Sequence, residues 1–223
     1  MEIIKQALKA GQTTLSEYDS KKVLAEYKIP VTKEIVAKDI NELNQAAEKI
    51  GFPLVLKGSS SEIAHKTEKG LIKIDIRTLE EATGAFEEII AKMGDDKGGV
   101  LVQEMIKGQR ELVIGLTRDP QFGPCVMFGL GGIFTEILKD VAFRVAPLTR
   151  KDAMDIMEDI KSRKILDAVR GMEAVDREVL ADILIAVGQI GMDYDEVQEI
   201  DINPLKIRDG KPVAVDALLV LKP

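Results

Sequence analysis

The chain has 223 residues, of which 45% are hydrophobic and 31% are charged, and its formal net charge is −7. This composition is typical of a globular protein that buries a hydrophobic core. The negative charge argues against a nucleic-acid partner, because binding to a phosphate backbone relies on an excess of Lys and Arg. No apolar run reaches the roughly 18 residues that a membrane span needs, so we expect no membrane partner.

A single cysteine, Cys125, excludes an internal disulfide and favours a reducing, cytoplasmic location. It lies in the apolar run FGPCVMFG, which we interpret as a buried strand with an inert thiol. The first residues, MEIIKQALKAGQ, are too short and too charged for a secretory signal peptide.

Hydrophobic spacing and capping residues predict alternating helices and strands in the first half of the chain. In order, these are a helix from Ser16 that ends before Pro30, a strand at 31–39, a helix capped by Asn41 and closed by Gly51, strands at 52–59 and 71–76, and a helix that Thr78 and Glu81 open and Gly94 ends. The Gly-rich run GDDKGG, residues 94–99, follows and has no apolar anchor. We therefore expect two domains: residues 1–97, an N-terminal helix plus a first lobe, and residues 98–223, a second lobe.

The second half reads mainly as strands, followed by two helices and a hairpin. We expect strands at 100–106, 110–119, 124–132 and 135–148, helices capped near Thr149 and Asp176, and a final hairpin at 197–221. Because strands and helices intermix without a strict βαβ rhythm, the predicted fold class is α+β with two lobes.

The final hairpin carries candidate metal ligands. Asp209-Gly210 is a strong signal for a two-residue turn, and this turn places Asn203 opposite Asp216. Because side chains alternate along a strand, Glu199, Asp201 and Asn203 share one face. Such carboxylate and amide oxygens suit Mg²⁺, and the alternative is a solvated polar face.

Three other features could contact a bound anion or base. Lys57 follows the apolar run PLVL and could act as a point charge for phosphate, or could be a solvated strand end. The loop GLGG, residues 129–132, could let backbone N–H groups approach an anion, or could be a simple turn. Glu104 and Glu111 lie on adjacent predicted strands, and Met105 and Ile106 between them could pack on a flat base.

Several motifs in order resemble one family. They are GFPLVLK, AHKTEKG, VLVQEMIKGQRELVIG, FGLGGIFTEILKDVAFRVAPL, and EIDINPL followed by VAVDALL. Together they resemble the ATP-grasp fold, and within it the nucleotide-binding β subunit of ADP-forming acyl-CoA (acetyl-CoA) synthetases, relatives of succinyl-CoA synthetase. The resemblance covers about residues 12 to 221. It implies two α+β lobes with a nucleotide cleft between them, ATP or ADP and Mg²⁺ as cofactors, and a CoA-binding α subunit as partner in a hetero-oligomer.

The resemblance also implies roles for individual residues. Lys57 resembles the phosphate-contacting lysine, and Gly131 and Gly132 resemble parts of the nucleotide loop. Glu104 resembles the acceptor for the adenine amino group, with Met105 and Ile106 at the ring edge, and Glu111 resembles a partner for ribose or nearby substrate. Asn203 and Asp216 resemble the Mg²⁺ ligands, assisted by Asp201 or Glu199. The motif around the single histidine departs from the family pattern, because Leu71 stands where a second glycine is usual.

His65 is the predicted catalytic residue. It resembles a phosphate carrier that takes a phosphoryl group from a phosphohistidine on the partner and passes it to ADP. The chain would then be half of an acid–thiol ligase that converts acyl-CoA, ADP and phosphate into acid, CoA and ATP. The alternatives are a self-contained ATP-grasp carboxylate ligase, with its own acceptor pocket, and a nucleotide-sensing subunit without turnover.

Overall fold

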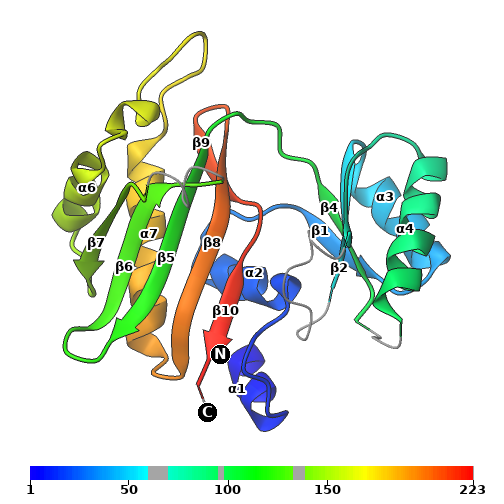
Figure 1. Cartoon of the computed structure of the whole chain (residues 1–223), viewed down its shortest axis with the longest axis horizontal. Coiled ribbons are helices and arrows are strands. Elements are labelled where there is room, and N and C mark those ends of the chain that lie inside the picture. Colours follow the sequence, from blue (N-terminus) through cyan, green and yellow to red (C-terminus); the bar gives the residue numbers. More distant parts are fainter. Residues whose placement is uncertain (60–69, 95–97, 133–138, 223) are drawn as a thin grey trace. The chain divides into compact units, whose positions relative to one another are not determined.

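The computed structural model describes residues 1–59, 70–94, 98–132 and 139–222, and the chain divides into two compact units (Figure 1). Unit 1 consists of Met1–Leu15, Asp19–Val31 and Lys107–Pro223. Unit 2 consists of Ser16–Tyr18 and Thr32–Ile106. Both combine helices with antiparallel sheets, which confirms the predicted α+β class.

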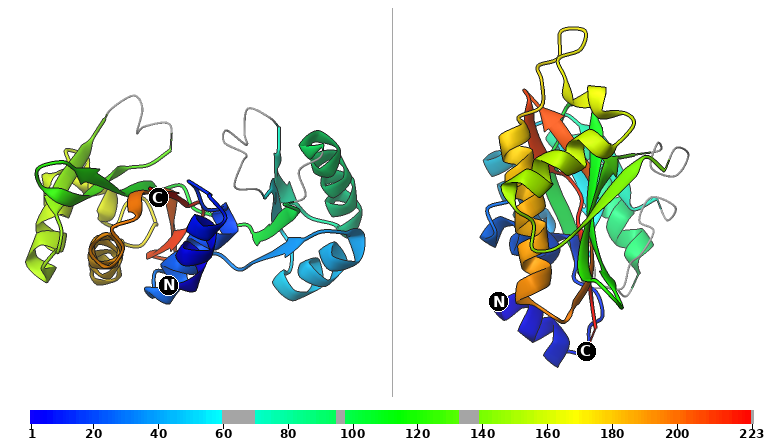
Figure 2. Two further views of the ribbon diagram at one scale, coloured as in Figure 1. Left: turned by 90° about the horizontal axis from the view of Figure 1, so that it is seen from below. Right: turned by 90° about the vertical axis from the view of Figure 1, so that its left-hand side faces the viewer.

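Unit 2 is a four-stranded antiparallel sheet in the order β1-β4-β2-β3, with α3 and α4 packed on one face (Figures 1 and 2). Its elements are β1 (Glu34–Ala37), α3 (Ile40–Ile50), β2 (Leu54–Gly58), β3 (Ile72–Ile76), α4 (Leu79–Met93) and β4 (Val100–Glu104). Leu71 is 1% exposed in the core of this unit, so the departure from the family pattern at this position supplies a core side chain.

Helix caps in unit 2 follow the sequence in part. Thr78 accepts a hydrogen bond from the backbone N–H of Glu81 and begins α4, as predicted. The carboxylate of Glu81, however, accepts from the N–H of Arg77 and does not complete the expected capping box. The predicted cap of α3 was wrong: Asp39 caps this helix, and Asn41 lies within its first turn. Asp39 is the N-cap because its carboxylate accepts a hydrogen bond from the N–H of Glu42.

Unit 1 holds a six-stranded sheet in the order β10-β8-β5-β6-β7, with β9 paired to β8. Its elements are α1 (Glu2–Lys9), α2 (Glu17–Glu26, of which residues 17 and 18 belong to unit 2), β5 (Glu111–Asp119), β6 (Gly123–Leu130), β7 (Val141–Val145), α6 (Arg150–Asp159), η1 (Arg163–Leu166), α7 (Arg177–Asp193), β8 (Val197–Arg208), β9 (Lys211–Ala214) and β10 (Leu218–Leu221). Helices α6 and α7 cover one face of this sheet (Figure 2). As predicted, Thr149 and Asp176 cap these helices.

The two units divide the chain at other points than the sequence predicts. We expected a boundary at residues 97 and 98, but β4 pairs with β1 and β2, which keeps the chain in unit 2 as far as Ile106. The helix α1, with Ile4 and Ala7 buried, belongs to unit 1 and not to the first lobe. A Gly-rich, charged run between α4 and β4 is therefore a connection inside one sheet unit.

Helix length and hydropathy also bear on the membrane question. Within the described residues, no helix is long and apolar enough to cross a membrane.

Cys125 is buried in β6, and burial raises the pKa of its thiol, in accord with an inert core residue.

Candidate functional site

The final hairpin has the register that the Asp209-Gly210 turn predicts. The pairs are Arg208 with Lys211, Ile207 with Pro212, Lys206 with Val213 and Leu205 with Ala214. The same register returns farther from the turn, where Leu218 pairs with Asp201. Asn203 and Asp216 lie between these two stretches and are therefore opposed, with the N–H of Val215 donating to the carbonyl of Pro204 at 3.1 Å.

A bulge on β8 sits at this position. On the neighbouring strand, Leu112 pairs with Leu205 and Ile114 with Ile202, so two residues of β8 face the single residue Val113. The two residues of the bulge are Asn203 and Pro204. Because a bulge re-aims a side chain, it explains how the amide oxygen of Asn203 reaches out of the ladder to accept from the N–H of Gly132 at 3.3 Å.

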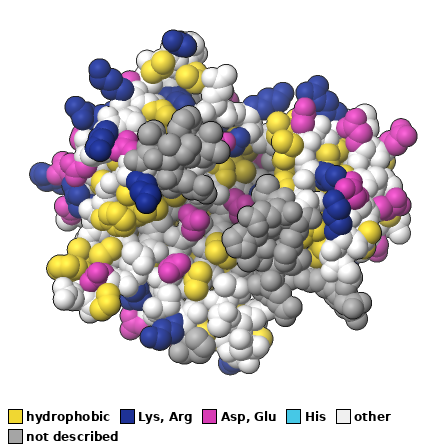
Figure 3. All heavy atoms as spheres, in the orientation of Figure 1, with side chains coloured by type: hydrophobic (Ala, Val, Ile, Leu, Met, Phe, Trp, Pro, Cys, Tyr) yellow, Lys and Arg dark blue, Asp and Glu magenta, His cyan; other side chains and the backbone are white. Residues whose placement is uncertain are grey.

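Acidic side chains lie beside Asn203 on the face of the six-stranded sheet opposite α6 and α7. Glu199, Asp201 and Asn203 line one pocket of about 460 Å³, as the alternation predicts, and the intervening Ile202 is buried. The remaining lining residues are Val113, Gly115, Leu116, Thr117, Met127, Phe143 and Ile200. Figure 3 shows acidic and hydrophobic side chains together on this face.

Glu199, Asp201 and Asp216 make this cluster acidic. The pKa of Asp201 is raised to about 6, first by burial and then by the nearby charges of Asp216 and Glu199. A divalent cation favours the ionised form of such carboxylates, and carboxylate and amide oxygens are hard ligands of the kind that Mg²⁺ binds. The donor set of Asp201, Asn203 and Asp216 therefore fits Mg²⁺. Within the described residues, no three His, Cys, Asp or Glu side chains converge tightly enough to hold an ion by themselves.

Glu111 joins the same region of unit 1. Its carboxylate pairs with Lys206, its partner across the β5–β8 ladder, at 3.1 Å. A β-carbon at Gly132 would collide with the other carboxylate oxygen of Glu111. The structure thus brings together Glu111, Gly132 and Asn203, which lie far apart in the sequence.

Gly131 and Gly132 hydrogen-bond within the chain through their backbone N–H groups. The N–H of Gly131 donates to the carbonyl of Glu111 at 2.9 Å, and the N–H of Gly132 donates to Asn203. Both N–H groups therefore hydrogen-bond within the chain, because the segment runs directly against β5. Their lack of side chains allows the close approach, since a β-carbon at Gly131 would lie 2.5 Å from the carbonyl oxygen of Leu112.

This close approach predicts a stability difference between two glycines. Gly131→Ala should lower the free energy of unfolding by more than about 1 kcal/mol, because the new methyl group meets backbone. Gly84→Ala is the matched control: it lies inside α4, has nothing within 4 Å of the added carbon, and should gain about 0.5–1 kcal/mol. Urea unfolding of both variants measures the difference, and equal midpoints would contradict the packing described here.

Lys57 lies in unit 2, and its ammonium is not a solvated strand end. It is the penultimate residue of β2, is 4% exposed, and donates from Nζ to Oε1 of Glu17 at 2.7 Å. The side chain of Glu17 is 1% exposed, so the two form a buried ion pair. Buried pairs gain little stability over apolar packing, which favours a functional reason for keeping this one.

Glu104 and its neighbours also lie in unit 2. One carboxylate oxygen of Glu104 accepts from the N–H of Lys33 at 2.8 Å, and the N–H of Met105 donates to the carbonyl of Pro53 at 3.1 Å. Ile106 is 4% exposed. The expectation that Glu104 and Glu111 lie on adjacent strands was wrong, because β4 and β5 belong to different sheets in different units.

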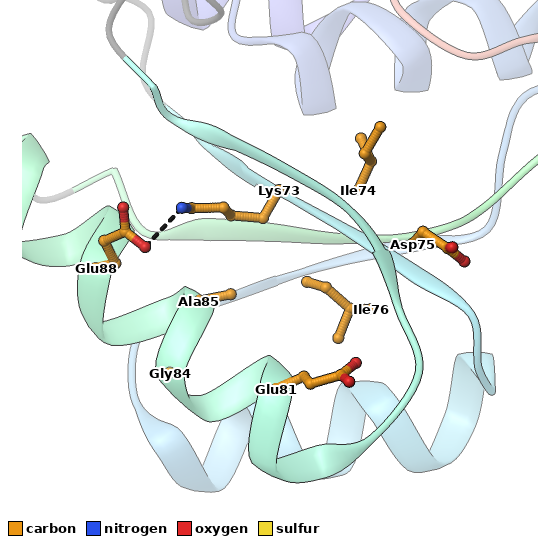
Figure 4. A pocket seen from close by; sticks show the side chains of 8 residues that line it. All are labelled: Lys73, Ile74, Asp75, Ile76, Glu81, Gly84, Ala85 and Glu88. Atoms are coloured by element: carbon orange, nitrogen blue, oxygen red, sulfur yellow. Dashed lines mark ion pairs between the residues drawn. The ribbon is translucent and has the colours of Figure 1, made fainter.

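One predicted residue, His65, lies outside the described residues, together with its neighbours at 60–69. A second pocket, of about 430 Å³, lies elsewhere in unit 2 between β3 and α4 (Figure 4). Lys73 reaches across it to Glu88 at 2.6 Å. None of the predicted site residues lines this pocket.

Sequence reasoning missed Glu17 and Lys206, the charged partners of Lys57 and Glu111. Both belong to runs that read as ordinary secondary structure, and each partner is far away in the chain. Pro204 was an available signal, because proline within a strand favours a bulge or an edge.

Two α+β units with antiparallel sheets are the architecture of an ATP-grasp domain, a class of nucleotide-binding fold. The ATP-grasp domain family model matches residues 6–221, so the chain belongs to that family. It is 44% identical to the β subunit of ADP-forming acetate–CoA ligase I of Pyrococcus furiosus, across 99% of this chain and 97% of that one. The chain is thus homologous to the β subunits of ADP-forming acid–thiol ligases.

Solved structures of similar sequence share this fold. The chain superimposes with a TM-score of 0.94 and 41% identity on acetyl-coenzyme A synthetase 1 of Ca. Korarchaeum cryptofilum in complex with coenzyme A and Ca-AMPCP, covering 99% of both chains. Another structure of that enzyme, with Mg-AMPPCP and its phosphohistidine segment pointing towards the nucleotide binding site, matches with a TM-score of 0.88 and 41% identity, again over 99% of both chains.

Proposed function

We propose that the chain is the nucleotide-binding subunit of an ADP-forming acyl-CoA synthetase. With a CoA-binding partner it converts acyl-CoA, ADP and phosphate into a carboxylic acid, CoA and ATP. The observation that carries the proposal is the meeting of Asn203, Gly132 and Glu111 beside the acidic face of β8, in a chain that matches β subunits of such enzymes from end to end.

Unit 1 holds the proposed metal ligands. Asn203 and Asp216 bind Mg²⁺ through oxygen, with Asp201 or Glu199 assisting through water, and the nucleotide phosphates complete the coordination. When bound, Mg²⁺ neutralises phosphate charge and orients the terminal phosphate. The raised pKa of Asp201 supports this assignment, because the charges of Asp216 and Glu199 lie close to it and a bound cation would offset them.

Unit 2 holds the proposed phosphate lysine and base contacts. Lys57 donates to phosphate oxygens, and its ion pair with Glu17 fixes the direction of the ammonium group. An ammonium has three N–H donors, so one bond to Glu17 is compatible with a bond to phosphate. Glu104 receives the adenine amino group, while its bond to the N–H of Lys33 holds the carboxylate in place.

His65 carries the phosphoryl group in the proposed relay. The bond from phosphorus to the partner's phosphohistidine breaks as a bond to a ring nitrogen of His65 forms. That bond breaks in turn as phosphorus bonds to the terminal oxygen of ADP, which gives ATP and returns neutral His65. Neutral imidazole suits this role because its ring nitrogen is nucleophilic near neutral pH.

Reconstitution tests the proposed function. The chain is combined with a CoA-binding α subunit, and ATP is measured from acetyl-CoA, ADP, phosphate and Mg²⁺. We expect ATP to require both subunits. An acyl phosphate made from acetate and ATP by this chain alone would instead indicate a self-contained ligase. Nucleotide binding without turnover in either mixture would indicate a sensor, and both outcomes would contradict the proposal.

The base contact predicts a change in nucleotide preference. Glu104→Ala should reduce the preference for ATP over GTP by roughly ten- to hundredfold, because a lost hydrogen bond to a charged group is worth about 1.5–3 kcal/mol. Guanine presents a carbonyl where adenine presents its amino group, so GTP binding should change less. Competitive binding of the two nucleotides measures the ratio. Glu34→Ala, on the neighbouring strand β1, is the control, and an unaltered ratio in the Glu104 variant would place the base elsewhere.

A further inference from the structure

Lys21 is a buried charge with no role in the proposed chemistry. It lies in α2, is 1% exposed, and is one of the largest fully buried side chains among the described residues. Its ammonium donates to the carbonyl oxygen of Val215 at 3.0 Å. Both residues belong to unit 1, and Val215 immediately precedes Asp216 in the chain.

Asp216 lies in a break between two strands. β9 ends at Ala214 and β10 begins at Leu218, so the strand ladder does not hold the backbone at residues 215–217. The N–H of Val215 donates to Pro204, and its carbonyl receives Lys21. Lys21 thus takes the place of a ladder hydrogen bond directly beside Asp216.

Two further hydrogen bonds hold the end of the connection between β9 and β10. The hydroxyl of Ser20 accepts from the N–H of Leu219 at 3.1 Å, and the N–H of Leu15 donates to the carbonyl of Leu219 at 3.0 Å. Helix α2 therefore lies against the start of β10, as Figures 1 and 2 show. Ser20 fixes the far side of the connection, and Lys21 fixes its near side.

We propose that Lys21 is a positioning residue for the metal site, which holds the Val215 carbonyl so that the carboxylate of Asp216 faces the cation. This inference rests on the proposed function, because it assumes that Asp216 binds Mg²⁺. Stability alone gives a poor reason for the residue, since burying an ammonium is costly and an apolar side chain of similar length would fill the same space. Partners that orient metal ligands typically change metal affinity by about ten- to hundredfold when they are replaced.

The test compares Lys21→Met with Lys22→Met. Methionine is close to lysine in length and lacks the donor, and Lys22 is an exposed neighbour on α2 that pairs with Asp19 at 3.5 Å. We measure the affinity of the chain–ADP complex for Mn²⁺ by electron paramagnetic resonance, and the affinity for ADP in the presence of EDTA. Lys21→Met should weaken Mn²⁺ binding about tenfold or more and leave metal-free ADP binding unchanged. Lys22→Met should match the wild type in both.

Two further variants keep the outcome decisive. If Lys21→Met melts below the assay temperature, Lys21→Leu replaces it, because leucine is apolar and also lacks a donor. Asp216→Asn tests the proposed function itself: if it binds Mn²⁺ as the wild type does, the metal site is misassigned. If Asp216→Asn loses Mn²⁺ affinity while the Lys21 variants keep it, the metal site stands and the role of Lys21 is overturned.

Discussion

Replacing His65 with alanine should reduce ATP formation from acetyl-CoA by the two-subunit enzyme by roughly 10³-fold or more, because a covalent carrier has no substitute in the chain. His65 is the only histidine in the sequence. Binding of Mg-ADP should persist, since Lys57, Glu104, Asn203 and Asp216 are unchanged. A coupled assay of ATP measures the first effect, and calorimetry measures the second.

Retained binding is the control that separates chemistry from folding. A His65→Ala protein that binds Mg-ADP normally but makes no ATP has lost the transfer step alone. Wild-type turnover by this variant, with the α subunit present, would exclude His65 as the carrier. Loss of both activities would assign His65 to nucleotide binding and contradict the proposed relay.

Asp216→Asn should weaken the binding of Mg-ADP at least tenfold, which corresponds to about 1.4 kcal/mol. Asparagine keeps one oxygen ligand and the size of the side chain but removes the negative charge that attracts the cation. The hairpin should stay folded, because its pairs from Leu205 to Lys211 do not involve residue 216.

Asp209→Asn is the matched control for this substitution. It makes the same chemical change in the same hairpin, at a turn position with φ of +51° that asparagine tolerates. Its affinity for Mg-ADP should equal that of the wild type. Calorimetry measures the affinity of both variants for Mg-ADP. Equal affinities in the two variants would show that Asp216 is not a metal ligand.

Local signals in the sequence predicted the parts of the fold that depend on nearby residues. The Asp209-Gly210 turn determined the hairpin register because a two-residue loop leaves one pairing, and that register opposed Asn203 to Asp216. Thr149 and Asp176 began helices because their side chains reach N–H groups in the first turn. Motif order then led to the ATP-grasp family, which the match over residues 6–221 confirms.

Contacts between distant segments could not be predicted in this way. The pairs Glu17–Lys57 and Glu111–Lys206 join residues that are 40 and 95 positions apart, and no local pattern encodes their meeting. The glycines of GLGG illustrate the same limit: composition predicted an accessible loop, but tertiary packing against β5 engages both N–H groups. The division into units failed for a related reason, because glycine-rich runs also connect a helix to a strand of the same sheet.

Transfer of labelled phosphate tests directly whether His65 carries the phosphoryl group. The chain and its α subunit are incubated with Mg²⁺ and ATP that carries a labelled terminal phosphate, and the label is located by digestion and mass spectrometry. We expect an acid-labile, base-stable label on the peptide that contains His65. Addition of ADP should remove this label and form labelled ATP. Label on the α subunit alone, with the His65 peptide unlabelled at every time point, would contradict this role of His65.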